Sequence, residues 1–518
     1  MTRRQLAAVG TGASLGVMHP RAVLARQDDA TPEAPAVDAP GASPVAGEDG
    51  AASWLLVAAF EVDGAADPEP TDRDVTIYNG QLEARATIKL PETARLSPTA
   101  HPDLALASTD VGPWVIDCRA GEARQIDWAE AEPDYSHLPD PRSSHSHRQH
   151  PDWAVITDLD QRRPMLASLP DASGVDLSTT LRVSDEGEFF FPLSAFTRDG
   201  SQALITGTDF AYWLVPTADP EAARLLDGGR TGWLTSSASF SDDDTHIVYR
   251  ASDPDSDDAI IAVAAVDGGD PVEIAPVPGF AFARFLPGSH DALLIFAEDG
   301  VYRRDVEGGD GIGELIAPTE RLPYDILGGE RDDRLIVGAR PSTAAAVRWF
   351  TVDPDGGDPT AHPDLTGLVP HGPSYFTPAP RFVLFSPQTA DGPVAGSTLV
   401  GVDRASARTV GLLDGVIDDQ VAQSYSTSED GRIVYFTPRG SREAYLLNLE
   451  TGEATQVAID HYPAPDENNF VNPEGTLLAV TERSRRDGVP TVLLIDVNAP
   501  DAPEDLREGT VWRWTGAV

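Results

Sequence analysis

Short apolar runs alternate with polar, turn-forming segments along most of this chain. The first three runs, at residues 54–60, 75–78 and 84–90, combine aliphatic, β-branched and aromatic side chains in continuous or alternating order. Such runs predict three successive β-strands, which is most of one small antiparallel sheet. The last ten residues contain one more alternating run, Trp512-Arg513-Trp514, for which we expect a closing strand that pairs with the first sheet and removes its exposed edge.

The same arrangement recurs about ten times at a period of roughly 43 residues, which is typical of β-propellers and related β-arrays. Each copy begins with an aromatic or aliphatic residue, followed by a turn of the Ser-Pro-Asp-Gly type and two or three short strands. A second mark, an Asp-Gly-Gly type turn late in the copy, suits a tight hairpin with positive φ. The clearest copies begin at residues 195–200, 239–244, 284–288, 425–431 and 470–475, and the hairpin marks lie at 266–270, 306–310 and 355–358.

The copy at residues 240–270, Phe-Ser-Asp-Asp-Asp followed by two apolar strands and Asp-Gly-Gly, resembles the repeat of TolB-like propellers, which also occurs in the propellers of prolyl-oligopeptidase-type enzymes. The resemblance extends over most of residues 54–506 and implies four-stranded antiparallel blades. Because single rings usually have four to eight blades, we expect about eight, within a range of about seven to ten, with two copies as insertions or partial blades. Two separate propellers are the alternative.

A prolyl-oligopeptidase-type enzyme would also need an α/β-hydrolase domain with a Gly-x-Ser-x-Gly nucleophile elbow. The one match, Gly12-Ala13-Ser14-Leu15-Gly16, has neither the strand before it nor the helix after it. This kind of hydrolase is therefore excluded, and no catalytic residue is assigned.

The negative charge of the chain limits the kinds of ligand that it can bind. With 83 acidic against 38 basic residues the formal net charge is −45, and Lys89 is the single lysine. Nucleic acids and anionic lipid surfaces would repel such a chain, because their recognition depends on clustered Lys and Arg. We expect a monomer whose ligand is a protein, peptide or carbohydrate.

The N-terminal residues resemble an export signal. Arg3-Arg4 begins a twin-arginine-like segment, residues 1–25, which ends in a small-residue cleavage pattern before Arg26. Residues 26–52 are rich in Ala, Pro and acidic residues and predict a disordered linker, and residues 53–518 form the predicted propeller. We expect an exported protein without a transmembrane segment. The single cysteine, Cys118, permits no internal disulfide and predicts a buried structural thiol.

An insertion at residues 127–152 is rich in histidine. Its residues His145, His147 and His150 are candidate ligands for zinc or copper, because neutral imidazole suits both metals. The alternatives are an ordinary solvated loop and a pH-responsive loop. Asp253, Asp255 and Asp257 are candidate calcium ligands in an acidic loop, or else ordinary charged turn residues.

These features favour an exported, non-catalytic binding or scaffold propeller. The alternative is a metal-dependent propeller enzyme, a hydrolase or lyase, whose site would lie at the central channel. Linear spacing does not distinguish the two, since a propeller site is built from loops far apart in the chain.

Overall fold

The computed structural model describes strands and turns from Ser53 to Thr515. The described residues are 53–59, 72–91, 94–97, 99–109, 112–128, 150–158, 163–181, 194–206, 211–226, 234–252, 259–276, 281–286, 289–308, 311–318, 325–327, 335–339, 348–352, 360–362, 365–370, 381–389, 392–393, 399–403, 408–413, 425–436, 444–457, 470–483, 490–508 and 510–515.

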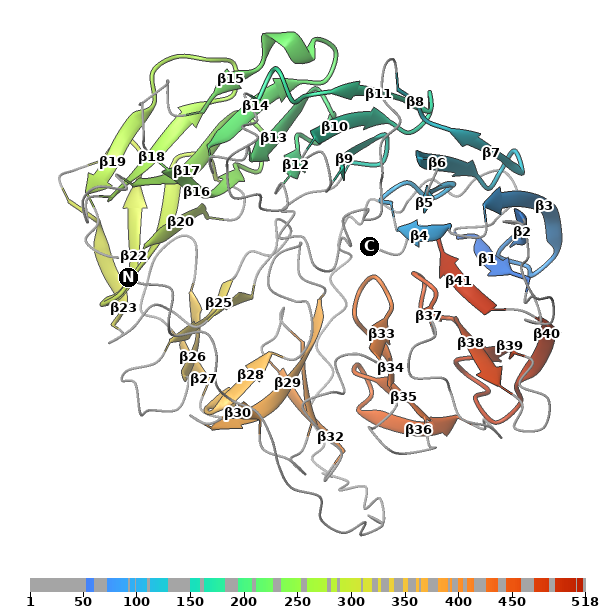
Figure 1. The fold of residues 1–518 in the computed structure, drawn as a ribbon. Coiled ribbons are helices and arrows are strands. Elements are labelled where there is room, and N and C mark those ends of the chain that lie inside the picture. The colour runs from blue at the N-terminus through green and yellow to red at the C-terminus, as the bar shows by residue number, and fades with distance from the viewer. Residues whose placement is uncertain are drawn as a thin grey trace, which may run out of the picture.

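The protein is all-β, a β-propeller of four-stranded sheets. The described strands form ten sheets, nine with four strands and one with five. Figure 1 shows the sheets following one another in chain order around a central region. Within the described residues, one short 3₁₀ helix, η1 (Pro220–Ala222), is present, and no helix is long and apolar enough to cross a bilayer.

The first five sheets contain the following strands. The first has β1 (Leu55–Ala58), β2 (Asp72–Tyr78), β3 (Ala84–Pro91) and β41 (Thr510–Trp514), and the second has β4 (Arg95–Ser97), β5 (Leu104–Thr109), β6 (Gly112–Asp117) and β7 (Glu122–Gln125). The third has β8 (Asp127–Trp128), β9 (Trp153–Asp158), β10 (Arg163–Ser168) and β11 (Ser173–Asp176), and the fourth has β12 (Ser194–Phe196), β13 (Gln202–Thr206), β14 (Tyr212–Pro216) and β15 (Arg224–Leu225). The fifth has β16 (Leu234–Phe240), β17 (His246–Ser252), β18 (Ala259–Ala265) and β19 (Val272–Pro276).

The other five sheets follow the same plan. The sixth has β20 (Phe282–Phe285), β21 (Ala292–Ala297), β22 (Gly300–Asp305) and β23 (Glu314–Pro318), and the seventh has β24 (Asp325–Leu327), β25 (Leu335–Ala339), β26 (Arg348–Val352) and β27 (Thr360–His362). The eighth has β28 (Leu368–Pro370), β29 (Phe382–Thr389), β30 (Gly392–Pro393), β31 (Leu399–Asp403) and β32 (Arg408–Leu413). The ninth has β33 (Tyr425–Thr427), β34 (Ile433–Phe436), β35 (Ala444–Asn448) and β36 (Glu453–Val457), and the tenth has β37 (Phe470–Val471), β38 (Leu477–Arg483), β39 (Pro490–Asp496) and β40 (Glu504–Glu508).

The number of described sheets lies at the upper end of the predicted range of about seven to ten blades. The favoured number is about eight, with two of the repeated copies as insertions or partial blades, because common single rings have four to eight. The described strands instead form ten sheets. Each copy supplies a sheet of its own, so none of the copies is spent as an insertion.

The predicted closing strand is confirmed. β41 pairs antiparallel with β1, with Leu55 opposite Trp514 and Ala58 opposite Thr510, and the two lie side by side in Figure 1. The first sheet therefore combines the first and last described strands of the chain. Trp514 is fully buried, and its indole Nε1 donates a hydrogen bond to the carbonyl oxygen of Phe470, at 3.1 Å, in the tenth sheet.

The core lies between neighbouring sheets rather than at one centre. Between the fourth and fifth sheets, Leu204 and Tyr212 pack against Tyr249 and Ala262, all of them buried. Similar apolar clusters join the first sheet to the second, the second to the third and the tenth to the first. Some edge strands are more exposed than the inner strands of the same sheet. In the second sheet, the edge strand β7 is largely exposed, whereas the inner strand β5 is buried throughout. Charged residues on outer strands keep these open edges in water.

Candidate functional site

The predicted metal ligands fall mainly outside the described residues. His145, His147, Asp253, Asp255 and Asp257 all lie there. His150 is described. It is buried, and its Nδ1 accepts a hydrogen bond from the backbone N–H of Asp152 at 3.1 Å. Among the residues that the structure describes, no three His, Cys, Asp or Glu side chains are grouped as a metal site requires. The metal sites remain predictions.

The best-defined polar feature is the turn between the first two strands of a sheet. In the fourth sheet, the Asp199 carboxylate accepts hydrogen bonds from Thr197 Oγ1 at 2.8 Å and from the backbone N–H of Ser201 at 2.9 Å. The pKa of Asp199 is accordingly lowered, chiefly by the hydrogen bonds from Ser201 and Thr197. Gly200 completes the turn with φ +67°, a conformation that glycine adopts without a steric penalty.

The same turn recurs around the protein. Its first residue carries a hydroxyl or amide, the third carries a carboxylate, and the fourth has positive φ. The equivalent sets are Ser241, Asp243 and Asp244, then Ser428, Asp430 and Gly431, then Asn472, Glu474 and Gly475. Sequence analysis identified these segments as markers of the repeat, and the structure shows that their side chains build the turn.

Two turns use histidine in place of the carboxylate. In the second sheet, Thr99 Oγ1 donates to the carbonyl oxygen of Leu104, and His101 Nδ1 accepts from the backbone N–H of Asp103 at 3.0 Å. His150 does the same for Asp152. Sequence reasoning missed this substitution, although the tripeptide His-Pro-Asp, which occurs at 101–103 and 150–152 as well as at 362–364, was a visible signal.

Neighbouring turns contact one another across the sheet boundaries. We call residues 99–103, 150–152, 197–201, 241–245, 289–291, 428–432 and 472–476 the turn belt. Four links join one turn to the next: Glu429 N to the Pro473 carbonyl, His101 to Asp152, Arg198 N to Asp244, and Asp243 to His290. Two more join turns to the residues just before β1: Ser53 Oγ donates to Glu474, and Trp54 Nε1 donates to Asp103. A further close contact comes from Gly200, because a Cβ there would lie 2.7 Å from two ring atoms of His150.

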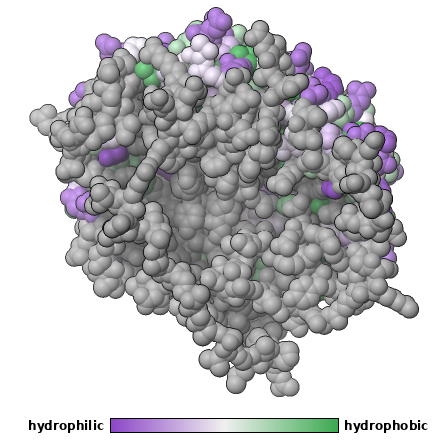
Figure 2. Space-filling model, viewed as in Figure 1, coloured by the Kyte–Doolittle hydropathy of each residue, from purple (hydrophilic) through white to green (hydrophobic). Residues whose placement is uncertain are grey.

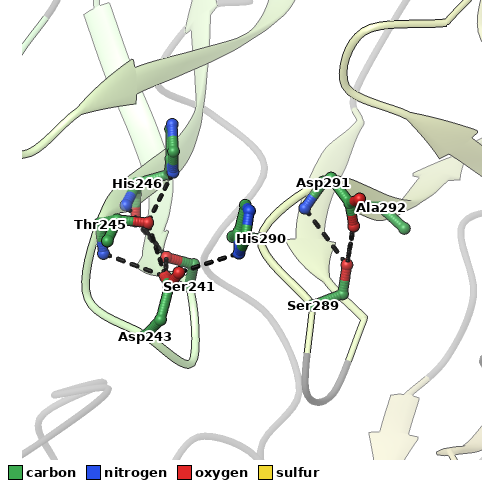
Figure 3. A network of polar contacts seen from close by, with 8 residues as sticks. All are labelled: Ser241, Asp243, Thr245, His246, Ser289, His290, Asp291 and Ala292. Atoms are coloured by element: carbon green, nitrogen blue, oxygen red, sulfur yellow. Dashed lines mark hydrogen bonds and ion pairs between the residues drawn. The ribbon is translucent and has the colours of Figure 1, made fainter.

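The link between the fifth and sixth sheets is the most elaborate (Figure 3). His290 Nδ1 lies 2.9 Å from Asp243 Oδ2, while Asp243 Oδ1 accepts from Ser241 Oγ and Thr245 Oγ1, each at 2.7 Å. Thr245 Oγ1 is also 2.8 Å from His246 Nδ1. The His246 and His290 rings stack at a centroid distance of 5.7 Å.

This network determines the charge of Asp243. Partial burial favours the protonated carboxyl, but the hydrogen bonds from Thr245 and Ser241 and the nearby His290 outweigh it and lower the pKa of Asp243 to about 2. Asp243 is therefore a carboxylate at neutral pH. Because it already accepts several protein hydrogen bonds, it acts here as a structural anchor between two sheets.

Several large side chains lie in the core. Tyr212, Trp213 and Trp349 are buried, and Trp349 Nε1 donates to the Leu368 carbonyl of the eighth sheet at 2.8 Å. Cys118 is buried, and that burial, together with Asp117 and Asp103, raises the pKa of its thiol. A buried, protonated thiol is a poor nucleophile.

Comparison with known proteins shows no matching family model and no matching curated protein. Solved structures with similarity include a eukaryotic initiation factor, 10% identical, with a TM-score of 0.41 over 89% of this chain and 98% of the other. Porphyromonas gingivalis dipeptidyl peptidase 4 is 12% identical, with a TM-score of 0.42 over 80% of this chain and 59% of the other. The β-propeller domain of Myceliophteria thermophila Cps50 (Swd1) is 16% identical, with a TM-score of 0.30 over 57% of this chain and 93% of the other. None of these likenesses assigns a function.

Proposed function

We propose that this protein is an exported, non-catalytic propeller that binds a protein or peptide partner with a basic surface. The observation that carries the proposal is the turn belt. Its carboxylates and imidazoles are engaged in holding turns and in joining one sheet to the next, as Asp243 does with His290 at 2.9 Å. A set of turns cross-linked in this way is a rigid platform, on which the more variable loops between strands can present a binding surface.

The charge of the chain supports a basic partner. A formal net charge of −45 creates a negative potential that attracts cationic surfaces and raises their rate of association. The same potential disfavours acidic ligands. Binding should therefore weaken as salt screens the charges, since the Debye length falls from about 30 Å at 0.01 M to about 8 Å at 0.15 M ionic strength.

A peptide array tests the proposal. Folded protein comprising residues 26–518 is applied to immobilised random peptides of equal length and graded net charge, at low and at physiological salt, beside a glycan array. We expect saturable binding that is enriched in Arg- and Lys-containing peptides and reduced by salt, with acidic peptides of matched composition as the control. Binding that is independent of peptide charge, or that is confined to glycans, would contradict a basic protein partner.

Export is tested separately with the full chain. In a bacterial host with a working twin-arginine pathway, the shortened mature protein should accumulate outside the cytoplasm. The double variant Arg3→Lys, Arg4→Lys should keep the precursor in the cytoplasm, because that pathway reads the arginine pair itself. Equal export of both forms would remove the twin-arginine part of the proposal and leave the binding proposal untouched.

A further inference from the structure

The turn of the second sheet, like that of His150, is held by an imidazole where other described turns use a carboxylate. In the fourth, fifth and ninth sheets a carboxylate accepts the backbone N–H two residues later, at 2.9 to 3.1 Å. In the second sheet His101 Nδ1 accepts the N–H of Asp103, at 3.0 Å. A carboxylate accepts at any pH above about 4, whereas imidazole accepts only while that nitrogen carries no proton.

This turn also holds the two ends of the array together. The Asp103 carboxylate accepts a hydrogen bond from Trp54 Nε1 at 2.9 Å, and the Pro102 carbonyl accepts one from Thr515 Oγ1. Trp54 and Thr515 directly flank the closing pair of strands β1 and β41, and they bond each other through Trp54 N to Thr515 Oγ1 at 2.9 Å and Thr515 N to the Trp54 carbonyl at 2.8 Å. The position of residues 102 and 103 therefore controls contacts on both closing strands.

We propose that His101 is a proton-sensitive latch on the closure of the ring. With a neutral imidazole the turn is held and the β1–β41 junction is anchored to the second sheet. When Nδ1 is protonated, it becomes a donor that faces another donor, the backbone N–H of Asp103, so the hydrogen bond that holds the turn is lost. The hydrogen bonds from Trp54 and Thr515 to residues 103 and 102 then weaken. Mild acid would then open the protein at this junction.

The charges around His101 set the direction of the effect. Burial of the imidazole is the largest influence and lowers its pKa from the ordinary value of 6.5, as does the nearby Arg119, while Asp103, Asp152 and Asp117 favour the proton without reversing the result. Of these, Asp152 Oδ1 is 4.0 Å from His101 Nε2. Because the folded state binds the proton less well than the unfolded state, the stability from this site is present above pH 6.5 and is lost as the pH falls below it.

Hydrogen exchange at two pH values tests the latch. Peptides covering β1 and β41 in the full chain are compared at about pH 5 and about pH 7.5, corrected for the intrinsic exchange rate. We expect these peptides to lose protection at the lower pH, while β13, which follows a turn held by the Asp199 carboxylate, stays protected. In His101→Asn the amide oxygen accepts the same N–H at both pH values, so the closing strands should remain protected.

A second variant covers the case in which His101→Asn fails to fold. Asp152→Asn leaves the acceptor in place and removes a carboxylate that favours the imidazolium, so the loss of protection should move to lower pH. The latch is wrong if β1 and β41 are equally protected at both pH values in the unmodified protein, if they open in His101→Asn as they do in that protein, or if Asp152→Asn leaves the midpoint unchanged.

Discussion

Single residues determine the geometry of each turn. In the carboxylate turns the fourth position has positive φ, which Gly200, Gly431 and Gly475 supply at +67°, +70° and +67°, whereas the two histidine turns have proline there, whose φ is fixed at about −65°. Asp244 holds the same conformation at +60°, and its carboxylate accepts a hydrogen bond from the backbone N–H of Arg198 at 2.6 Å. An aspartate is tolerated there because short polar side chains visit this region, and its contact joins the fourth and fifth sheets.

We expect Gly200→Ala to be destabilising for two reasons. The left-handed conformation costs a residue with a Cβ about 1–2 kcal/mol, and the new methyl would lie 2.7 Å from His150 ring atoms. Thermal unfolding measures the loss. Gly311→Ala is the control, since Gly311 also has positive φ, +88°, with nothing within 4 Å of an added Cβ. Equal losses in the two variants would show that the contact with His150 contributes nothing.

We expect Asp243→Asn to weaken the junction between the fifth and sixth sheets. The folded state lowers the pKa of Asp243 from 3.8 to about 2, so its carboxylate stabilises the fold above pH 3.8, and this contribution is lost as the pH falls toward 2. The difference in unfolding free energy between the two proteins should be largest near neutral pH and should shrink in acid. A difference that is constant from neutral pH down to about pH 3 would contradict this role.

At the scale of elements, the closing strand β41 both covers an edge of the first sheet and adds to the core. β41 covers one edge of β1, whose four residues are all buried, and it contributes Val511 and Trp514 to the cluster that joins the first and tenth sheets. An open edge next to a buried apolar strand is a site for pairing with other chains. The strand therefore protects the protein from aggregation as well as stabilising it.

Deleting residues 509–518 should lower the melting temperature sharply and promote aggregation. The loss of buried Trp514 alone is worth about 3–5 kcal/mol by analogy with Trp-to-Ala changes in cores. Differential scanning calorimetry and light scattering would follow the two effects. Removing only residues 516–518, which follow the strand, is the control. A melting temperature that is the same for both deletions would show that β41 is dispensable.

At the scale of the whole molecule, charge opposes compactness. A net charge of −45 produces self-repulsion in the folded state that salt screens. The chain compensates through the apolar contacts between sheets, such as the cluster of the fifth and sixth sheets around Ile261 and Ile295. Ordered polar contacts between turns add to these.

We therefore expect stability to rise with ionic strength. The melting temperature at neutral pH should increase between about 0.01 M and about 0.5 M sodium chloride, since the Debye length falls to a few ångströms over this range. Sucrose at matched osmolality is the control, because it strengthens burial without screening charge. A melting temperature that falls with salt would indicate that attractive ion pairs outweigh the repulsion.

The sequence alone determined the all-β class, the repeated turns, the burial of Cys118 and the alternating run of the closing strand, because these depend on the local alternation and turn chemistry that each copy carries. Tertiary structure decided the number of sheets and the turn belt. Ser53 and Glu474 are 421 positions apart, and Trp54 and Thr515 are 461 apart. Such pairs come into contact only because the packing of all the sheets between them brings the two ends of the array together. His101 shows the same limit. Its place in a turn could be read from the sequence, but its control over the closing strands follows from which turn lies beside the two ends of the array.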